Sequence, residues 1–181
     1  MQDTPRKRVP LTIVFALLAS VGAGCSFSAG SSNEIDAAKA ERFVKAQVDR
    51  AFPTTIHVGA ASCPGGVKEK KHTAFTCSVK VENGLVRVEL TQLDDKGTVK
   101  ITRTNDAVLD AAKLQQTVVA KFDEQTGQVV TAKCTNRRYL VAAVGSTFDC
   151  KVTNQAGKTT QVAITVKDSD GNVQIHSPGF A

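Results

Sequence analysis

The stretch Phe75-Thr76-Cys77-Ser78-Val79-Lys80-Val81 decides the fold. Its apolar residues alternate with polar ones, and this period of two predicts a strand with one buried face and one solvated face. Asn83-Gly84 follows it and predicts a hairpin turn, because both residues tolerate a positive φ. The alternation returns over 86–90, and a second turn at 95–97 precedes a last apolar pair at 99–101. An antiparallel meander is therefore expected.

The same pattern occurs twice in the chain, and the offset between the copies grows from block to block. The first cysteines, Cys63 and Cys134, are 71 residues apart, and the second, Cys77 and Cys150, are 73 apart. The later strands and turns over 88–101 recur at an offset of 74 over 162–175. Loops absorb insertions between such blocks. A single domain with coincidental alternation is the alternative, and it leaves the ordered series unexplained.

A helix is expected at the start of each copy. Ala40, Val44, Val48 and Phe52 recur every four residues and form one apolar stripe. Ser32 or Asn33 can cap the first helix, and Pro53 discourages helix beyond Phe52. The second stripe, at an offset of 70, ends before a glycine; its members are Leu114, Val118 and Phe122, and the glycine is Gly127.

We therefore predict an α+β fold, a tandem repeat in which each copy packs one helix on an antiparallel sheet of about four strands. The shorter first strands are expected around 56–60 and 129–132. The predicted boundaries are 34–103 for copy one and 104–181 for copy two. About four residues, 102–105, join the copies, so close packing between them is expected.

Four cysteines lie inside the two copies, and we expect two disulfides. Zinc is the competing interpretation, but the spacings lack the close cysteine pairs of common zinc sites. Pairing Cys63 with Cys77, and Cys134 with Cys150, keeps the repeat intact, whereas crossed pairings break it. A unit of about 70 residues buries a small core, and a disulfide can supply about 3 kcal/mol.

The fifth cysteine, Cys25, follows a basic start, an apolar run over 11–21 and the small residues Gly22-Ala23-Gly24. This order is typical of an export signal. The segment Val21-Gly22-Ala23-Gly24-Cys25 resembles the lipobox of bacterial lipoproteins, which implies cleavage after residue 24 and a diacylglycerol on Cys25. Residues 25–33 are then a lipidated tether, and the protein is anchored in the cell envelope on the outer side of the cytoplasmic membrane. Plain secretion and an uncleaved membrane anchor are the alternatives.

Composition argues against nucleic-acid binding. Without residues 1–24 the chain keeps 20 basic and 16 acidic residues, a net charge of +4. It has no tryptophan and one tyrosine, Tyr139, so it lacks an aromatic platform for stacking bases. The positive charge leaves attraction to anionic lipid or envelope polymers open.

No catalytic, metal or cofactor site is predicted. His57, His72 and His176 stand at no metal-ligand spacing, and Asp168 and Asp170 fit a hairpin turn better than a calcium loop. Basic residues between the paired cysteines, together with Tyr139 next to two arginines, are the candidate partner-binding residues. If the copies pack side by side, these loops form one surface; solvated loops are the alternative. The residues are Lys68, Lys70, Lys71, Arg137, Arg138 and Tyr139.

The stretch Cys63-Pro64-Gly65-Gly66-Val67, with 75–79 and a later glycine turn, resembles the domain of unknown function 4333. That family occurs mainly in actinobacterial lipoproteins and exported proteins. The resemblance covers 35–102, and less closely 107–176, where Cys134-Thr135-Asn136 replaces Cys-Pro-Gly. The architecture is also similar to that of the beta-lactamase inhibitor protein, which is a parallel of shape alone.

We accordingly expect a lipid-anchored envelope protein, not an enzyme, whose modules bind a protein or an anionic envelope component without a cofactor. Inhibition of an exported enzyme is one alternative. An envelope hydrolase is another, and it requires a pocket between the copies that gathers polar residues such as His57 and His176.

Overall fold

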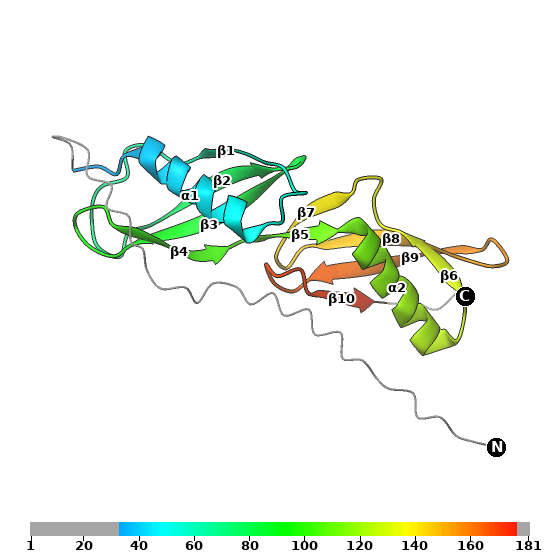
Figure 1. Cartoon of the computed structure of the whole chain (residues 1–181). Coiled ribbons are helices and arrows are strands. Elements are labelled where there is room, and N and C mark those ends of the chain that lie inside the picture. The colour runs from blue at the N-terminus through cyan, green and yellow to red at the C-terminus, as the bar shows by residue number, and fades with distance from the viewer. Residues whose placement is uncertain (1–32, 177–181) are drawn as a thin grey trace, which may run out of the picture.

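The computed structural model describes residues 33–176, and Cys25 lies outside them. The chain forms two helix-plus-sheet copies that lie end to end (Figure 1). Each copy has one helix and one four-stranded antiparallel sheet, as the repeat predicts. Copy one contains α1 (Ala37–Ala51), β1 (Val58–Ser62), β2 (Ala74–Val81), β3 (Gly84–Gln92) and β4 (Val99–Thr104). Copy two contains β5 (Asp106–Asp110), α2 (Ala111–Thr126), β6 (Val130–Lys133), β7 (Tyr139–Ala143), β8 (Thr147–Asn154), β9 (Thr159–Val166) and β10 (Val173–His176).

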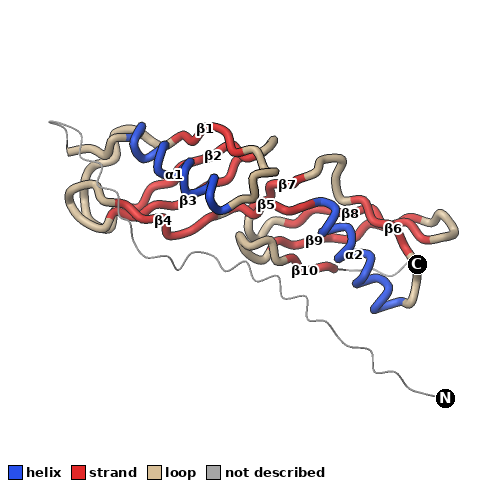
Figure 2. Tube along the Cα trace, viewed as in Figure 1, coloured by secondary structure: helices blue, strands red, loops and turns tan. Residues whose placement is uncertain are grey.

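The two sheets have matching strand orders, β1-β2-β3-β4 and β6-β8-β9-β10 (Figure 2). In both, the apolar residues of the alternating strands face the helix and form the core of that copy. The large fully buried side chains include Leu90 in copy one and Phe122 and Ile164 in copy two. The prediction that the alternating strands have one buried face and one solvated face is thus confirmed.

The disulfides join Cys63 to Cys77 and Cys134 to Cys150, one within each copy. In each copy the first cysteine directly follows the edge strand, β1 or β6, and the second lies in the neighbouring strand of the sheet, β2 or β8, where it is fully buried. The predicted pairing is confirmed. Each bridge fixes the register of an edge strand against its neighbour.

The helix starts differ from the sequence prediction. Asp36, rather than Ser32 or Asn33, caps α1, and its carboxylate accepts a 3.0 Å hydrogen bond from the Lys39 amide. Asp110 caps α2 in the same way. Since Ile35-Asp36-Ala37-Ala38-Lys39 recurs as Leu109-Asp110-Ala111-Ala112-Lys113, the helices align at an offset of 74. The offset of 70 was wrong by about one helical turn.

A third, two-stranded sheet was not predicted. β5 pairs antiparallel with β7 along its whole length, from Asp106 opposite Ala143 to Asp110 opposite Tyr139. Copy one has a shorter form of the same feature, a bridge between Glu34 and Lys68. The residues before each helix therefore pair with the loop between the two cysteines. Only Asn105 separates β4 from β5, so the connection between the copies is shorter than expected.

The first hairpin turn also differs in detail. Its two loop residues are Glu82 and Asn83, and Glu82 takes the positive φ of 51°. Gly84 is already the first residue of β3, opposite Val81. Because Gly84 has no side chain, Val141 of copy two can pack against it at the junction between the copies.

Candidate functional site

The basic loop of copy one lies at the end of the molecule farthest from copy two. The fully buried Gln92 holds it, since the Gln92 Oε1 atom accepts from the Lys70 amide at 2.9 Å and its Nε2 atom donates to the Lys68 carbonyl at 2.8 Å. The Lys71 amide donates to the carboxylate of Asp95 at 2.8 Å. The lysine side chains are exposed, and the Lys68 Nζ atom forms a 2.6 Å ion pair with Glu34.

The basic loop of copy two lies beside the junction instead. Tyr139 is 9% exposed, and its hydroxyl lies 3.2 Å from the Thr55 Oγ1 atom of copy one. The Arg138 guanidinium lies over the Tyr139 ring, 5.2 Å from its centroid. Tyr139 therefore joins the two copies, and Arg137 and Arg138 remain exposed.

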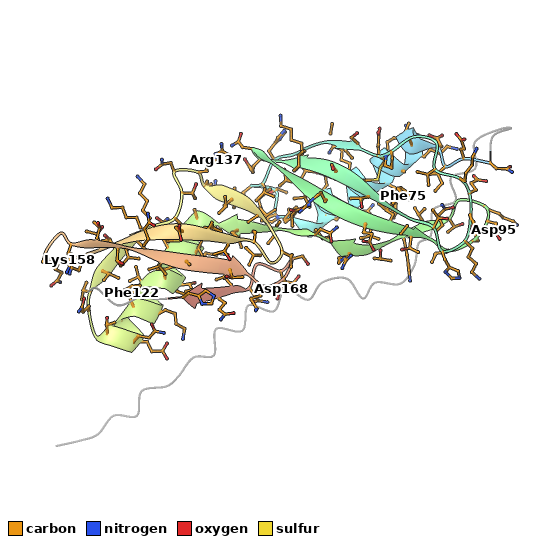
Figure 3. All side chains as sticks on the ribbon, turned by 180° about the vertical axis from the view of Figure 1, so that it is seen from behind. Phe75, Asp95, Phe122, Arg137, Lys158 and Asp168 are labelled. Atoms are coloured by element: carbon orange, nitrogen blue, oxygen red, sulfur yellow. A yellow bond between two sulfur atoms is a disulfide. The ribbon has the colours of Figure 1, made fainter. Side chains whose placement is uncertain are left out.

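The structure does not bring the two basic loops together. In Figure 3, Arg137 lies near the middle of the molecule, whereas Asp95, which holds Lys71, lies at the far end of copy one. The hypothesis of one combined basic surface was wrong, because the copies meet end to end and not side by side. The sequence repeat shows that two similar units exist, but it does not show which faces meet.

The junction between the copies is closely packed and charged. Asp106 of β5, 6% exposed, accepts three hydrogen bonds from Arg87 of β3, from the backbone amide, Nε and Nη2 at 2.7, 2.9 and 2.7 Å. This bidentate ion pair raises the pKa of the Arg87 guanidinium, chiefly through its hydrogen bonds to the Asp106 carboxylate. Val108 and Val141 of copy two pack against the core of copy one. The two copies are therefore in direct contact through a buried carboxylate and apolar packing.

The three histidines lie at different elements of the fold. The backbone amide of His57 donates to the Glu82 carboxylate beside the first hairpin, whereas the His176 Nε2 atom lies 3.3 Å from the Thr165 hydroxyl on β9. His72 lies in the basic loop of copy one with a φ of 67°. Within residues 33–176, no group of histidine, cysteine and carboxylate side chains is arranged to hold a metal ion.

The carboxylates with shifted pKa values are structural. A hydrogen bond from the Thr98 hydroxyl, at 2.7 Å, lowers the pKa of Asp94, with further help from backbone amides in the same turn. The Lys39 amide lowers the pKa of Asp36 at the helix start. Asp168 holds the matching turn of copy two through the Asp170 amide, which agrees with the expected hairpin turn.

A shallow groove runs between α2 and β6. Five of its ten lining residues are aliphatic and five are polar, most of the exposed area of the lining is apolar, and Val129 at its edge is 63% exposed. Asp123 is the single titratable side chain in the lining. The groove therefore resembles an apolar contact surface more than a site for acid–base chemistry. The lining residues are Gln115, Gln116, Val119, Ala120, Asp123, Gln128, Val129, Val130, Thr131 and Ala132.

Both helices cover the same side of the molecule, and the opposite side of each sheet is left open (Figures 1 and 3). We call the outward residues of the second sheet the open face of copy two. They are mostly hydroxyl, amide and charged residues, and the alternation of the strands determines them. They are Thr131, Lys133, Thr147, Asp149, Lys151, Thr153, Thr159, Gln161, Ala163, Thr165, Gln174 and His176.

In a comparison with known protein families, one family matches the chain. The family described as Domain of unknown function (DUF4333) matches residues 20–97 and again residues 98–171. No curated protein and no solved structure matches the chain. The helices of the described residues are too short or too polar to cross a membrane.

Proposed function

We propose that this chain, which belongs to the DUF4333 family through both of its halves, is a lipid-anchored, non-catalytic binding module of the cell envelope. The order of charge, apolar run and small residues before Cys25 supports the anchor. Two disulfides are consistent with an oxidising, exported environment. The acyl chains on Cys25 hold the protein at the membrane surface.

The observation that carries the proposal is the end-to-end arrangement of two copies in direct contact, with the tether at one end. The backbone carbonyl of Asn33 accepts a 2.8 Å hydrogen bond from the Glu69 amide, so the chain enters the fold beside the basic loop of copy one. Seven residues, 26–32, separate it from Cys25 and span at most about 30 Å. The tether thus joins the fold at the end of copy one that is farther from copy two. Copies that are each held by a disulfide and packed against each other meet a partner with little ordering cost.

The anchor is tested by mass spectrometry of the intact mature protein and by fractionation of the cells. We expect an amino terminus at Cys25 that carries acyl mass, and the protein in the membrane fraction. Cys25→Ser is the matched variant, and it should lose the acyl mass and leave the membrane. A mature wild-type chain without acyl mass overturns the anchor.

The binding role is tested by cross-linking in the native envelope, followed by purification of the complexes. We expect a stoichiometric envelope component bound to the wild-type protein. An exported enzyme whose activity the protein blocks would replace the proposal with inhibition. Recovery of the wild-type protein alone, under conditions that capture a known envelope complex, would contradict a binding role.

A further inference from the structure

Two lysines lie directly opposite each other on the open face of copy two. Lys133 of β6 and Lys151 of β8 are register partners, and both are exposed. The disulfide between Cys134 and Cys150 joins the next residue pair along the same two strands. This bridge fixes the register, so the two ammonium groups cannot separate by strand slippage.

This arrangement is unfavourable for the isolated protein. Like charges directly opposite in a sheet repel each other, and within residues 33–176 neither lysine forms an ion pair. Asp149 lies two residues before Lys151 on the same face and is also without an ion pair in that range. Copy one avoids the repulsion, because its equivalent register partners are Ser62 and Ser78.

The residues around the pair on this face carry groups that form hydrogen bonds. Gln161 of β9 is the register partner of Lys151, and it continues the row across the sheet. The adjacent row consists of Thr131, Thr153 and Thr159, which are mutual register partners. The open face of copy two has no phenylalanine, tyrosine or tryptophan side chain, so it offers mainly hydroxyl, amide and charged groups.

We infer that the pair of Lys133 and Lys151 binds the acidic groups of an extended anionic polysaccharide. This inference rests on the proposed function, since it supplies the ligand class for the proposed envelope module. An anion between the two ammonium groups relieves their repulsion, and the neighbouring hydroxyl and amide groups bond to sugar hydroxyls. The net charge of +4 without residues 1–24 favours such a polymer.

A lipid headgroup fits this surface less well. The tether enters the fold at the far end of copy one, while the lysine pair lies in copy two. The open face of copy two also carries no large apolar side chain that can insert among acyl chains. A sugar polymer outside the membrane can reach this face, because copy two lies at the other end of the fold from the point where the tether enters.

The test measures binding of the mature protein, in a neutral detergent, to polygalacturonate at low salt, with dextran as the uncharged control. We expect binding to polygalacturonate and not to dextran. The double variant Lys133→Ser/Lys151→Ser, which copies the serine pair of copy one, should bind about tenfold more weakly. Asp149→Asn should bind more tightly, because it removes the carboxylate nearest along β8 to the pair.

The matched control is Lys70→Ser/Lys71→Ser, which removes the same charge from the basic loop of copy one. We expect it to bind as the wild type does. Equal losses in both double variants would show charge attraction without a site, and would overturn the inference. Absence of wild-type binding to polygalacturonate would overturn it too.

Two further measurements separate the other outcomes. Vesicles of phosphatidylglycerol that bind the wild type tightly, and Lys133→Ser/Lys151→Ser weakly, would assign the pair to lipid and overturn the polysaccharide. Thermal unfolding shows that the variant is folded, and its midpoint should rise slightly since the repulsion is gone. The lipid anchor is tested separately, by the acyl mass at Cys25 and by membrane fractionation. A protein that fails to bind polygalacturonate can therefore still be shown to be lipid-anchored.

Discussion

Gly84 of β3 leaves the space that Val141 of β7 fills. A Cβ atom at position 84 would lie 2.5 Å from the Val141 Cβ atom, which is closer than two carbon atoms can approach. Because Gly84 belongs to copy one and Val141 to copy two, this contact is part of the junction. A glycine that resembles a turn residue in the sequence is therefore a packing residue in the fold.

Gly84→Ala should destabilise the protein by about 1–3 kcal/mol, because β7 must move away from copy one. The free energy of unfolding from a denaturant titration measures the loss. Gly65→Ala is the matched control, since a Cβ atom at that position meets nothing within 4 Å. Equal stability of the two variants would show that the junction accepts the extra methyl group.

Arg87 and Asp106 should respond unequally to truncation. Arg87→Ala leaves the buried Asp106 carboxylate without its guanidinium partner and should cost about 3 kcal/mol. Asp106→Ala leaves an Arg87 side chain that is 49% exposed and remains solvated, so the loss should be smaller, about 1–2 kcal/mol. Denaturant titration of both variants checks the order, and the reverse order would contradict it.

Arg103→Ala is the control for that prediction. Arg103 pairs with Glu89 on the open side of copy one, where its side chain is 66% exposed. An exposed pair of this kind should contribute less than about 1 kcal/mol. A loss as large as that of Arg87→Ala would show that burial of the carboxylate is not the deciding factor.

The sequence was sufficient to predict the repeat, the strands of the two four-stranded sheets and the disulfides. The alternation of apolar and polar residues can be recognised in a single sequence, because each four-stranded sheet has one buried and one open face. The helix alignment failed for a physical reason: apolar residues recur every four positions, so a shift of one turn still superimposes the stripes. The capping aspartates, Asp36 and Asp110, give the correct alignment of the two helices, which the apolar stripes alone do not determine.

The junction could not be predicted from the sequence pattern. β5 and β7 are short strands of five residues, and their pairing depends on which ends of the two copies meet. Tyr139 lies in the segment between the paired cysteines, which predicts a partner-binding residue, but it is buried, with its hydroxyl 3.2 Å from the Thr55 Oγ1 atom. The opposing lysines were also missed, since register across strands does not follow from alternation within each strand.

Each disulfide should stabilise the protein by about 3 kcal/mol, because each closes a loop of about 15 residues in the unfolded chain. Cys63→Ala/Cys77→Ala and Cys134→Ala/Cys150→Ala test this, one copy at a time, by denaturant titration. Since the junction couples the copies, we expect a single unfolding transition in both variants. Two separate transitions would show that the copies unfold independently.

His72 stands where copy two has a glycine. Its φ is 67°, and its amide donates to the Gln92 carbonyl; Gly145, with a φ of 82°, makes the matching bond to Val166. His72→Gly should therefore stabilise the protein by up to about 1 kcal/mol, and Gly145→Ala should destabilise it by about 1 kcal/mol. Thermal unfolding of the two variants measures both effects. A destabilising His72→Gly would show that the imidazole makes a contact worth more than the backbone strain.

Asp94 should make stability depend on pH in the acid range. Its pKa is lowered below 3.8 in the folded protein, chiefly by the hydrogen bond from Thr98, so its contribution is present above that value. As the pH falls through the folded pKa, the carboxylate takes up a proton and the contribution is lost. The difference in melting temperature between the wild type and Asp94→Ala should therefore be constant above about pH 5 and shrink at lower pH. Thr98→Val removes the main cause and should weaken this pH dependence, whereas a difference that stays constant down to acid unfolding would contradict the lowered pKa.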